Sequence, residues 1–214
     1  DFPREKSHQA TMTSTPSTPQ QIYYTTHKET LRSIIQTDHF SDSVPPALVS
    51  TWLAALDPTS TIPLPPDIKG LYGGDLRSSI PIELAHDSYK YVLHESDAAK
   101  SELYARRMLI SLALLDLNTL GERDPTLASL ALWHKALALL RVEGAVEELG
   151  ETLRRYEKVR RRSSVSDQKI PTPERLKARL GRLAEGLQRK DIVGFLDSGG
   201  SENCARPTFH EKET

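Results

Sequence analysis

A turn signal between two long segments of helical spacing constrains this fold more than any other feature. The segment Gly121-Glu-Arg-Asp-Pro125 joins a glycine suited to the left-handed position after a helix, an aspartate suited to cap the next helix, and a proline suited to its first turn. Apolar residues recur at helical spacing before it, over 81–120, and after it, over 125–162. The sequence therefore predicts a long antiparallel helical hairpin.

Helical spacing predicts further helices on both sides of this hairpin. One is expected over 22–36, and a second follows Ser43 as its cap and stops at Asp57 before a proline. A break inside 81–120 is expected near Asp97, where this residue or its neighbour Ser96 can cap. A last helix starts after Thr172 as its cap and runs to about Asp197. Because no segment alternates with period two, the predicted fold class is all-α, a helical bundle with disordered termini.

Composition divides the chain into a helical domain and two polar ends. Residues 1–21 are rich in Ser, Thr, Pro and Gln and are expected to be disordered, and 198–214 are expected to form a flexible tail. The helical domain then covers 22–197, with a Pro/Gly-rich loop at 57–80 and a Ser-rich break at 163–171. The loop holds several apolar residues, which favours a segment pinned on the helices over a linker, the alternative.

The sequence also indicates the compartment. The lone cysteine, Cys204, has no internal disulfide partner, which is typical of a reducing compartment. The most apolar stretch, 108–117, is interrupted by Asp116 and is too short for a membrane span. The first residues lack the apolar centre of a signal peptide, and Met12 is an alternative natural start that leaves 1–11 outside the fold. We therefore expect an intracellular protein, cytoplasmic or nuclear, without a membrane span.

A seam of apolar residues follows the second half of the predicted hairpin. After Leu139, steps of three and four residues link its members, as in a coiled coil, or as in ordinary core packing, the alternative. We predict that Leu149, Leu153 and Tyr156 form an edge that contacts another protein or a second copy of the chain. The complete seam consists of Leu132, Leu139, Val142, Val146, Leu149, Leu153 and Tyr156.

Basic residues crowd at the end of this seam. Residues 154–190 hold 13 Lys and Arg against four acids, a net charge of +9, while the rest of the chain is −10. Three interpretations remain open: a solvated helix end that complements the helix dipole, a nucleic-acid contact, and a kinase target at Ser164, which follows two arginines. The acidic remainder of the chain disfavours nucleic acid. The predicted basic patch comprises Arg154, Arg155, Arg160, Arg161 and Arg162.

Local motifs for chemistry are missing. Glu83 and His86 have the Glu-x-x-His spacing of bundle di-iron proteins, but no second pair exists, and His134 has no evident partner. We therefore predict no metal, no cofactor and no catalytic residue. A helical enzyme remains an alternative, with a pocket near His86, Asp87 and Tyr91.

These observations predict a non-enzymatic scaffold or adaptor subunit of an intracellular protein complex. It would bind partner helices and be controlled by phosphorylation near Ser164. Nucleic-acid binding through 154–190 is the second alternative beside the enzyme.

Overall fold

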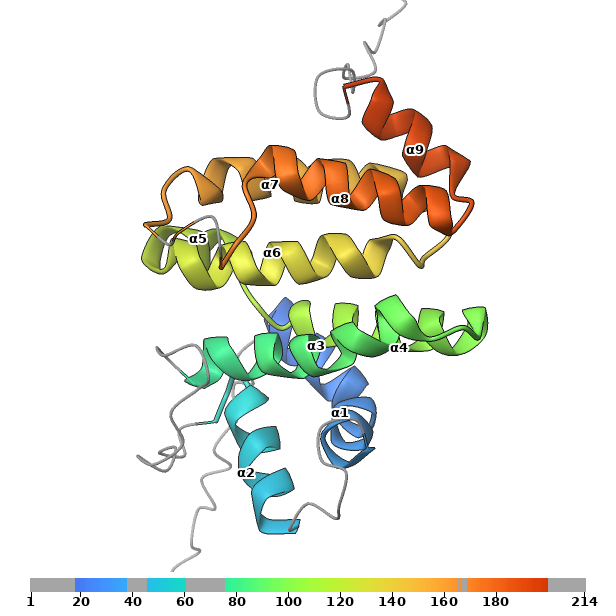
Figure 1. The fold of residues 1–214 in the computed structure, drawn as a ribbon. Helices are drawn as coiled ribbons and strands as arrows, with labels where there is room; N and C mark the ends of the chain where they lie inside the picture. Colours follow the sequence, from blue (N-terminus) through green and yellow to red (C-terminus); the bar gives the residue numbers. More distant parts are fainter. Residues whose placement is uncertain (1–17, 38–45, 61–75, 165, 167–168, 200–214) are drawn as a thin grey trace, which may run out of the picture.

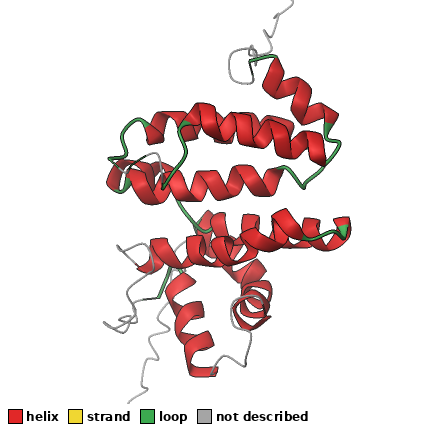
Figure 2. Cartoon of the chain, in the orientation of Figure 1, coloured by secondary structure: helices red, strands yellow, loops and turns green. Residues whose placement is uncertain are grey.

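The described part of the chain consists of helices joined by turns and loops. A computed structural model describes residues 18–37, 46–60, 76–164, 166 and 169–199, and this part contains no strand, which confirms the all-α class (Figure 2). Its helices, labelled in Figure 1, are α1 (Pro19–Thr37), α2 (Pro46–Leu56), α3 (Leu76–His94), α4 (Ala98–Leu112), α5 (Leu117–Arg123), α6 (Pro125–Leu139), α7 (Val146–Arg160), α8 (Pro173–Gly186) and α9 (Lys190–Asp197).

The helices form layers, with α3 and α4 in the middle (Figure 1). On one side α1 and α2 pack against them, and on the other side lie α6, α7 and α8. Ile80 and Leu84 of α3 join the apolar core shared with α1 and α2, while Ile82 and Ala85 join the larger core shared with α4 to α9. Because α3 is covered on both sides, it needs apolar residues on both faces.

Helix α6 is the centre of the larger core. Eleven of its 15 residues are buried, and it packs against α3, α4, α5 and α7. Helix α7 runs antiparallel to it, because Lys135 pairs with Glu148 near one end and the Thr126 hydroxyl lies 3.1 Å from the Ser163 hydroxyl near the other.

Three helix starts follow the predicted caps. The side chains of Asp97, Asp124 and Thr172 accept hydrogen bonds from backbone N–H groups in the first turns of α4, α6 and α8. Pro125 occupies the first turn of α6, as expected. These local signals satisfy otherwise unpaired donors, so sequence alone identifies them.

The two long arms of the predicted hairpin are each broken. The segment 125–162 divides into α6 and α7, because the chain turns over 140–145 with Gly144 at φ +70°, a conformation that ends a helix. The segment 81–120 divides as well: α4 ends at Leu112, and Asp116 caps the separate short helix α5.

The predicted role of Gly121 is wrong. It lies within α5 in helical conformation and not in a left-handed position after a helix. A Cβ atom built there would lie 3.1 Å from Val159 Cγ2, so the absence of a side chain allows α5 to approach α7 closely.

Other boundaries shift by a few residues. Helix α1 begins at Pro19, three residues early, and α3 begins at Leu76, inside the predicted loop. The predicted last helix divides into α8 and α9 around Gln188, whose φ is +57°. Ser43, most of the Pro/Gly-rich loop and both chain ends lie outside the described residues.

Candidate functional site

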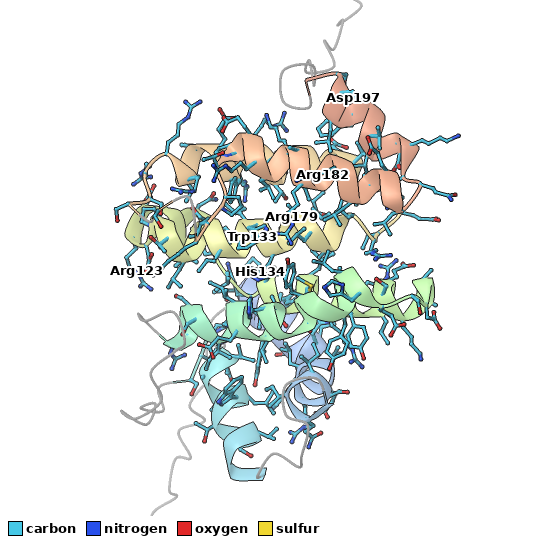
Figure 3. All side chains as sticks on the ribbon, viewed as in Figure 1. Arg123, Trp133, His134, Arg179, Arg182 and Asp197 are labelled. Atoms are coloured by element: carbon cyan, nitrogen blue, oxygen red, sulfur yellow. The ribbon has the colours of Figure 1, made fainter. Side chains whose placement is uncertain are left out.

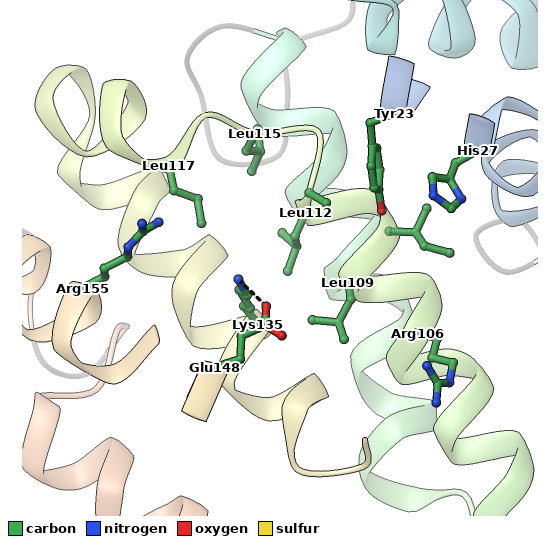
Figure 4. A pocket seen from close by; sticks show the side chains of 12 residues that line it. Tyr23, His27, Arg106, Leu109, Leu112, Leu115, Leu117, Lys135, Glu148 and Arg155 are labelled. Atoms are coloured by element: carbon green, nitrogen blue, oxygen red, sulfur yellow. Dashed lines mark ion pairs between the residues drawn. The ribbon is translucent and has the colours of Figure 1, made fainter. Parts of the chain in front are cut away.

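An apolar groove with a charged rim lies between α1, α4 and the α6–α7 pair. Its volume is about 580 Å³, within the range of ligand-binding sites in proteins. Figure 4 shows the side chains that line it, which are Tyr23, His27, Arg106, Leu109, Ile110, Leu112, Ala113, Leu115, Leu117, Lys135, Glu148 and Arg155.

The end of α4 builds the floor of this groove. Leu109 and Leu112 lie three residues apart, so they share one face of α4. The chain then leaves the helix and carries Leu115 into the groove, and Leu117 opens α5. Asp116 between them accepts hydrogen bonds from two backbone N–H groups of α5, which holds the turn in place.

Cations predominate on the rim. Lys135 Nζ lies 2.8 Å from Glu148 Oε1, and this ion pair links α6 to α7 inside the groove (Figure 4). Arg106 forms an ion pair with Glu102 at 2.5 Å, and Arg155 forms one with Glu151 at 2.8 Å. Neither of these two acids lines the groove, so three cations face one carboxylate there.

Helix α1 closes the groove with an aromatic pair. The rings of Tyr23 and His27 lie 4.3 Å apart between centroids, one helical turn from each other. Burial raises the pKa of the Tyr23 hydroxyl, so it stays neutral and can donate a hydrogen bond.

A second polar cluster joins α3, α6 and α8 (Figure 3). His86 Nδ1 lies 3.1 Å from His134 Nε2, a contact between two histidines for which no partner was evident from the sequence. Arg179 of α8 donates a hydrogen bond to the Tyr89 hydroxyl, and its guanidinium lies 5.8 Å from the Tyr89 ring and 5.9 Å from the Trp133 ring. These contacts hold three helices together.

Burial keeps His134 of this cluster uncharged. Burial, together with the nearby His86, lowers the pKa of His134 to about 4, against the opposing effect of the hydrogen bond to the Leu130 carbonyl. That carbonyl lies 2.7 Å from His134 Nδ1, so Nδ1 carries the proton and Nε2 accepts from His86.

The predicted partner edge lies in the core instead. Leu149, Leu153 and Tyr156 are 0%, 3% and 0% exposed, because α7 turns this face onto the larger core. The Tyr156 hydroxyl donates to the Pro171 carbonyl at 2.6 Å. Ordinary core packing, the alternative given above, describes these residues, and they present no exposed edge in this fold.

The five arginines of the predicted basic patch have different environments in the structure. Arg160 is 7% exposed, and its guanidinium donates to the backbone carbonyls of Ile170 and Pro171, so it fixes the chain between α7 and α8 and is not a surface charge. Arg155 and Arg161 pair with acids one turn earlier on α7. Arg154 and Arg162 are exposed.

Ser164 is exposed, in the non-helical stretch after α7. Its neighbour Ser163 is half-buried against Thr126 at the start of α6. A kinase could therefore reach the Ser164 hydroxyl, while its modification stays a prediction.

The structure describes the region of the predicted enzyme pocket in part, and His86 is exposed there. The Tyr91 ring stacks on Tyr104 with 4.6 Å between centroids, and the Asp87 side chain lies outside the description. No group of three or more His, Cys, Asp or Glu able to hold a metal occurs among the described residues.

Comparison with protein-family models, curated proteins and solved structures finds no match for this chain. Within the described part, no helix has both the length and the apolar character needed to cross a membrane.

Sequence reasoning missed the groove because five helices, α1, α4, α5, α6 and α7, supply its lining. One signal was present: the stretch 108–117 has more apolar residues than a single buried helix face requires. The surplus residues Leu109, Leu115 and Leu117 line the groove.

Proposed function

We propose that the chain is a non-enzymatic helical adaptor that binds a partner helix in the groove between α1, α4 and the α6–α7 pair. The observation that carries this proposal is an apolar floor bordered by three cations and one carboxylate. Apolar grooves of this kind receive the apolar stripe of an amphipathic helix, whose anchors recur every three or four residues. The charge of the rim favours a partner helix with acidic residues beside that stripe.

The apolar floor supports helix binding over nucleic-acid binding. Leu109, Leu115 and Leu117 are half-buried, so a partner side chain can complete their burial. A nucleic-acid site would instead gather exposed cations and stacking aromatics, whereas Arg160 of the predicted basic patch and Tyr156 beside it are buried.

Phosphorylation of Ser164 would provide control of the same adaptor. A phosphate adds a charge of about −1.5 to −2 at neutral pH. This charge would be added at Ser164, just after α7, and α7 is the helix that carries Arg155 on the rim of the groove. The added negative charge opposes an acidic partner, so Ser164→Glu is expected to weaken binding several-fold.

Fluorescence anisotropy with designed helical peptides tests the adaptor function. The probe is a labelled 18-residue peptide with leucines at positions i, i+3, i+4 and i+7 and glutamates on its remaining faces. A second peptide keeps the leucines and replaces every glutamate by lysine. The acidic peptide is expected to bind at least about tenfold more tightly than the basic one, because two or three rim cations change from attractive to repulsive partners.

Two neighbouring arginines of α7 provide a matched pair of variants. Arg155 lines the groove, whereas Arg154 is exposed outside it. Arg155→Glu is expected to weaken binding of the acidic peptide about fivefold or more, and Arg154→Glu to leave it within twofold. Equal binding of both peptides, or equal effects of both variants, would contradict the proposal. Binding of single-stranded DNA that Arg154→Glu and Arg162→Glu abolish would favour the nucleic-acid alternative.

A further inference from the structure

A small, separate pocket lies where the carboxyl-terminal parts of α3, α6 and α8 meet. Its volume is about 240 Å³, below the usual range for drug-sized ligands. Its wall is aliphatic and comes from all three helices, through Val92, Leu137, Leu140, Leu183 and Leu187. The pocket shares no lining residue with the groove, so a test of one is independent of a test of the other.

Two arginines border this aliphatic wall. Arg141 follows the end of α6, and Arg182 lies on α8 above the second half of α6 (Figure 3). No carboxylate lines the pocket, and within the described part of the chain neither guanidinium forms an ion pair or hydrogen bond. Arg141 is half-buried, and this burial lowers its pKa with no acidic neighbour to oppose the effect.

Arg189 engages the two backbone carbonyls that flank Arg141 along the chain. Its Nη1 donates to the carbonyls of Leu140 at 2.8 Å and Val142 at 3.0 Å, the groups nearest to Arg141 along the chain. Arg189 Nε donates to Asp191 Oδ1 at 2.9 Å and Arg189 Nη2 donates to Asp191 Oδ2 at 2.7 Å, which makes a bidentate ion pair. Arg189 thus occupies these two acceptors beside Arg141. Arg182 is exposed, and the donors of Arg141 and Arg182 can bind a ligand.

We propose that this pocket binds a carboxylate joined to a compact branched or aromatic apolar group. The planar guanidinium matches a carboxylate with two parallel hydrogen bonds, and the aliphatic wall excludes water from the apolar group. The volume admits a body about the size of one large side chain, which excludes long acyl chains. A peptide ending in leucine or phenylalanine and a free short-chain carboxylic acid share this chemistry.

Methyl NMR titrations of the full chain test the site with four probes. N-acetyl-leucine and its amide differ only in the carboxylate, and so do Gly-Gly-Leu and its amide. Each acid is expected to bind at least about tenfold more tightly than its amide, as the loss of a charge-assisted hydrogen bond implies. Higher affinity for Gly-Gly-Leu than for N-acetyl-leucine would assign the site to a peptide carboxyl terminus. Higher affinity for N-acetyl-leucine would assign it to a free acid.

Arginine variants locate the binding in this pocket. Arg141→Gln and Arg182→Gln are each expected to reduce the affinity of the acid about tenfold, whereas Arg175→Gln, earlier on the same α8, is expected to leave it unchanged. Circular dichroism melting shows whether each variant stays folded. Equal affinity for acid and amide, no methyl shift with any probe, or an equal effect of Arg175→Gln would overturn the proposal.

Discussion

Lowering the pH from 7 to 4 is expected to destabilise the chain through one buried histidine, His134. Burial lowers the pKa of His134 from 6.5 to about 4. An unfolded chain takes up this proton near pH 6.5, whereas the folded chain stays neutral until about pH 4. Because the unfolded state binds more protons between these values, stability is complete above pH 6.5 and falls as the pH decreases towards 4.

The size of this effect follows from the difference between the two pKa values. Each unit corresponds to about 1.4 kcal/mol, so the interval from 6.5 to about 4 represents about 3 kcal/mol. Besides the Leu130 carbonyl of its own helix, the groups around His134 are His86 and Tyr89 of α3, with Arg179 of α8 bound to Tyr89.

Urea unfolding followed by circular dichroism measures this loss. The free energy of unfolding is determined at several pH values between 7 and 4 for the wild type and for His134→Gln, which keeps an acceptor facing His86. Acidic residues titrate in both proteins, so the difference between the two curves isolates His134. The wild type is expected to lose about 3 kcal/mol relative to the variant. Parallel curves for the two proteins would refute the reasoning.

Two further pairs of substitutions and one single substitution test the helices and the basic segment by urea unfolding. Gly181→Ala is expected to stabilise the folded chain by about 0.5–1 kcal/mol, because Gly181 lies inside α8 with open space at its Cβ position. Gly144→Ala is expected to destabilise the folded chain by about 1 kcal/mol, because the φ angle of Gly144 is +70°. Arg160→Ala is expected to cost more than about 1 kcal/mol in the free energy of unfolding, since it removes the guanidinium donor from the Ile170 carbonyl, and Arg162→Ala less than about 0.5 kcal/mol. Asp124→Ala is expected to cost about 1 kcal/mol through loss of the α6 cap, and an unchanged stability would contradict that role.

Sequence reasoning identified those parts of the fold that depend on local chemistry. Asp97, Asp124 and Thr172 each cap a helix where their spacing predicted it, because a cap needs only the residue and the N–H groups that follow it. The turn at 140–145 was missed, although it contains Gly144, because helical spacing continues across it and hides the break.

The remaining errors concern contacts between distant segments. Gly121 looked like the end of a helix, but its role is to let α5 approach Val159 on α7. Arg160 was predicted to belong to a basic patch, but its guanidinium donates to backbone carbonyls of the segment between α7 and α8. The contact between His86 and His134 spans 48 residues, and no local pattern indicates a pair at that distance.

Binding of an acidic amphipathic helix in the groove, with its leucine floor and cationic rim, can be observed residue by residue. Methyl NMR of the chain with the leucine–glutamate peptide does so, because some leucines line the groove and others line the separate pocket. The methyl signals of Leu109, Leu115 and Leu117 are expected to shift, while those of Leu183 and Leu187 on the other pocket stay in place. Shifts confined to α8, or no shift at saturating peptide, would contradict binding in the groove.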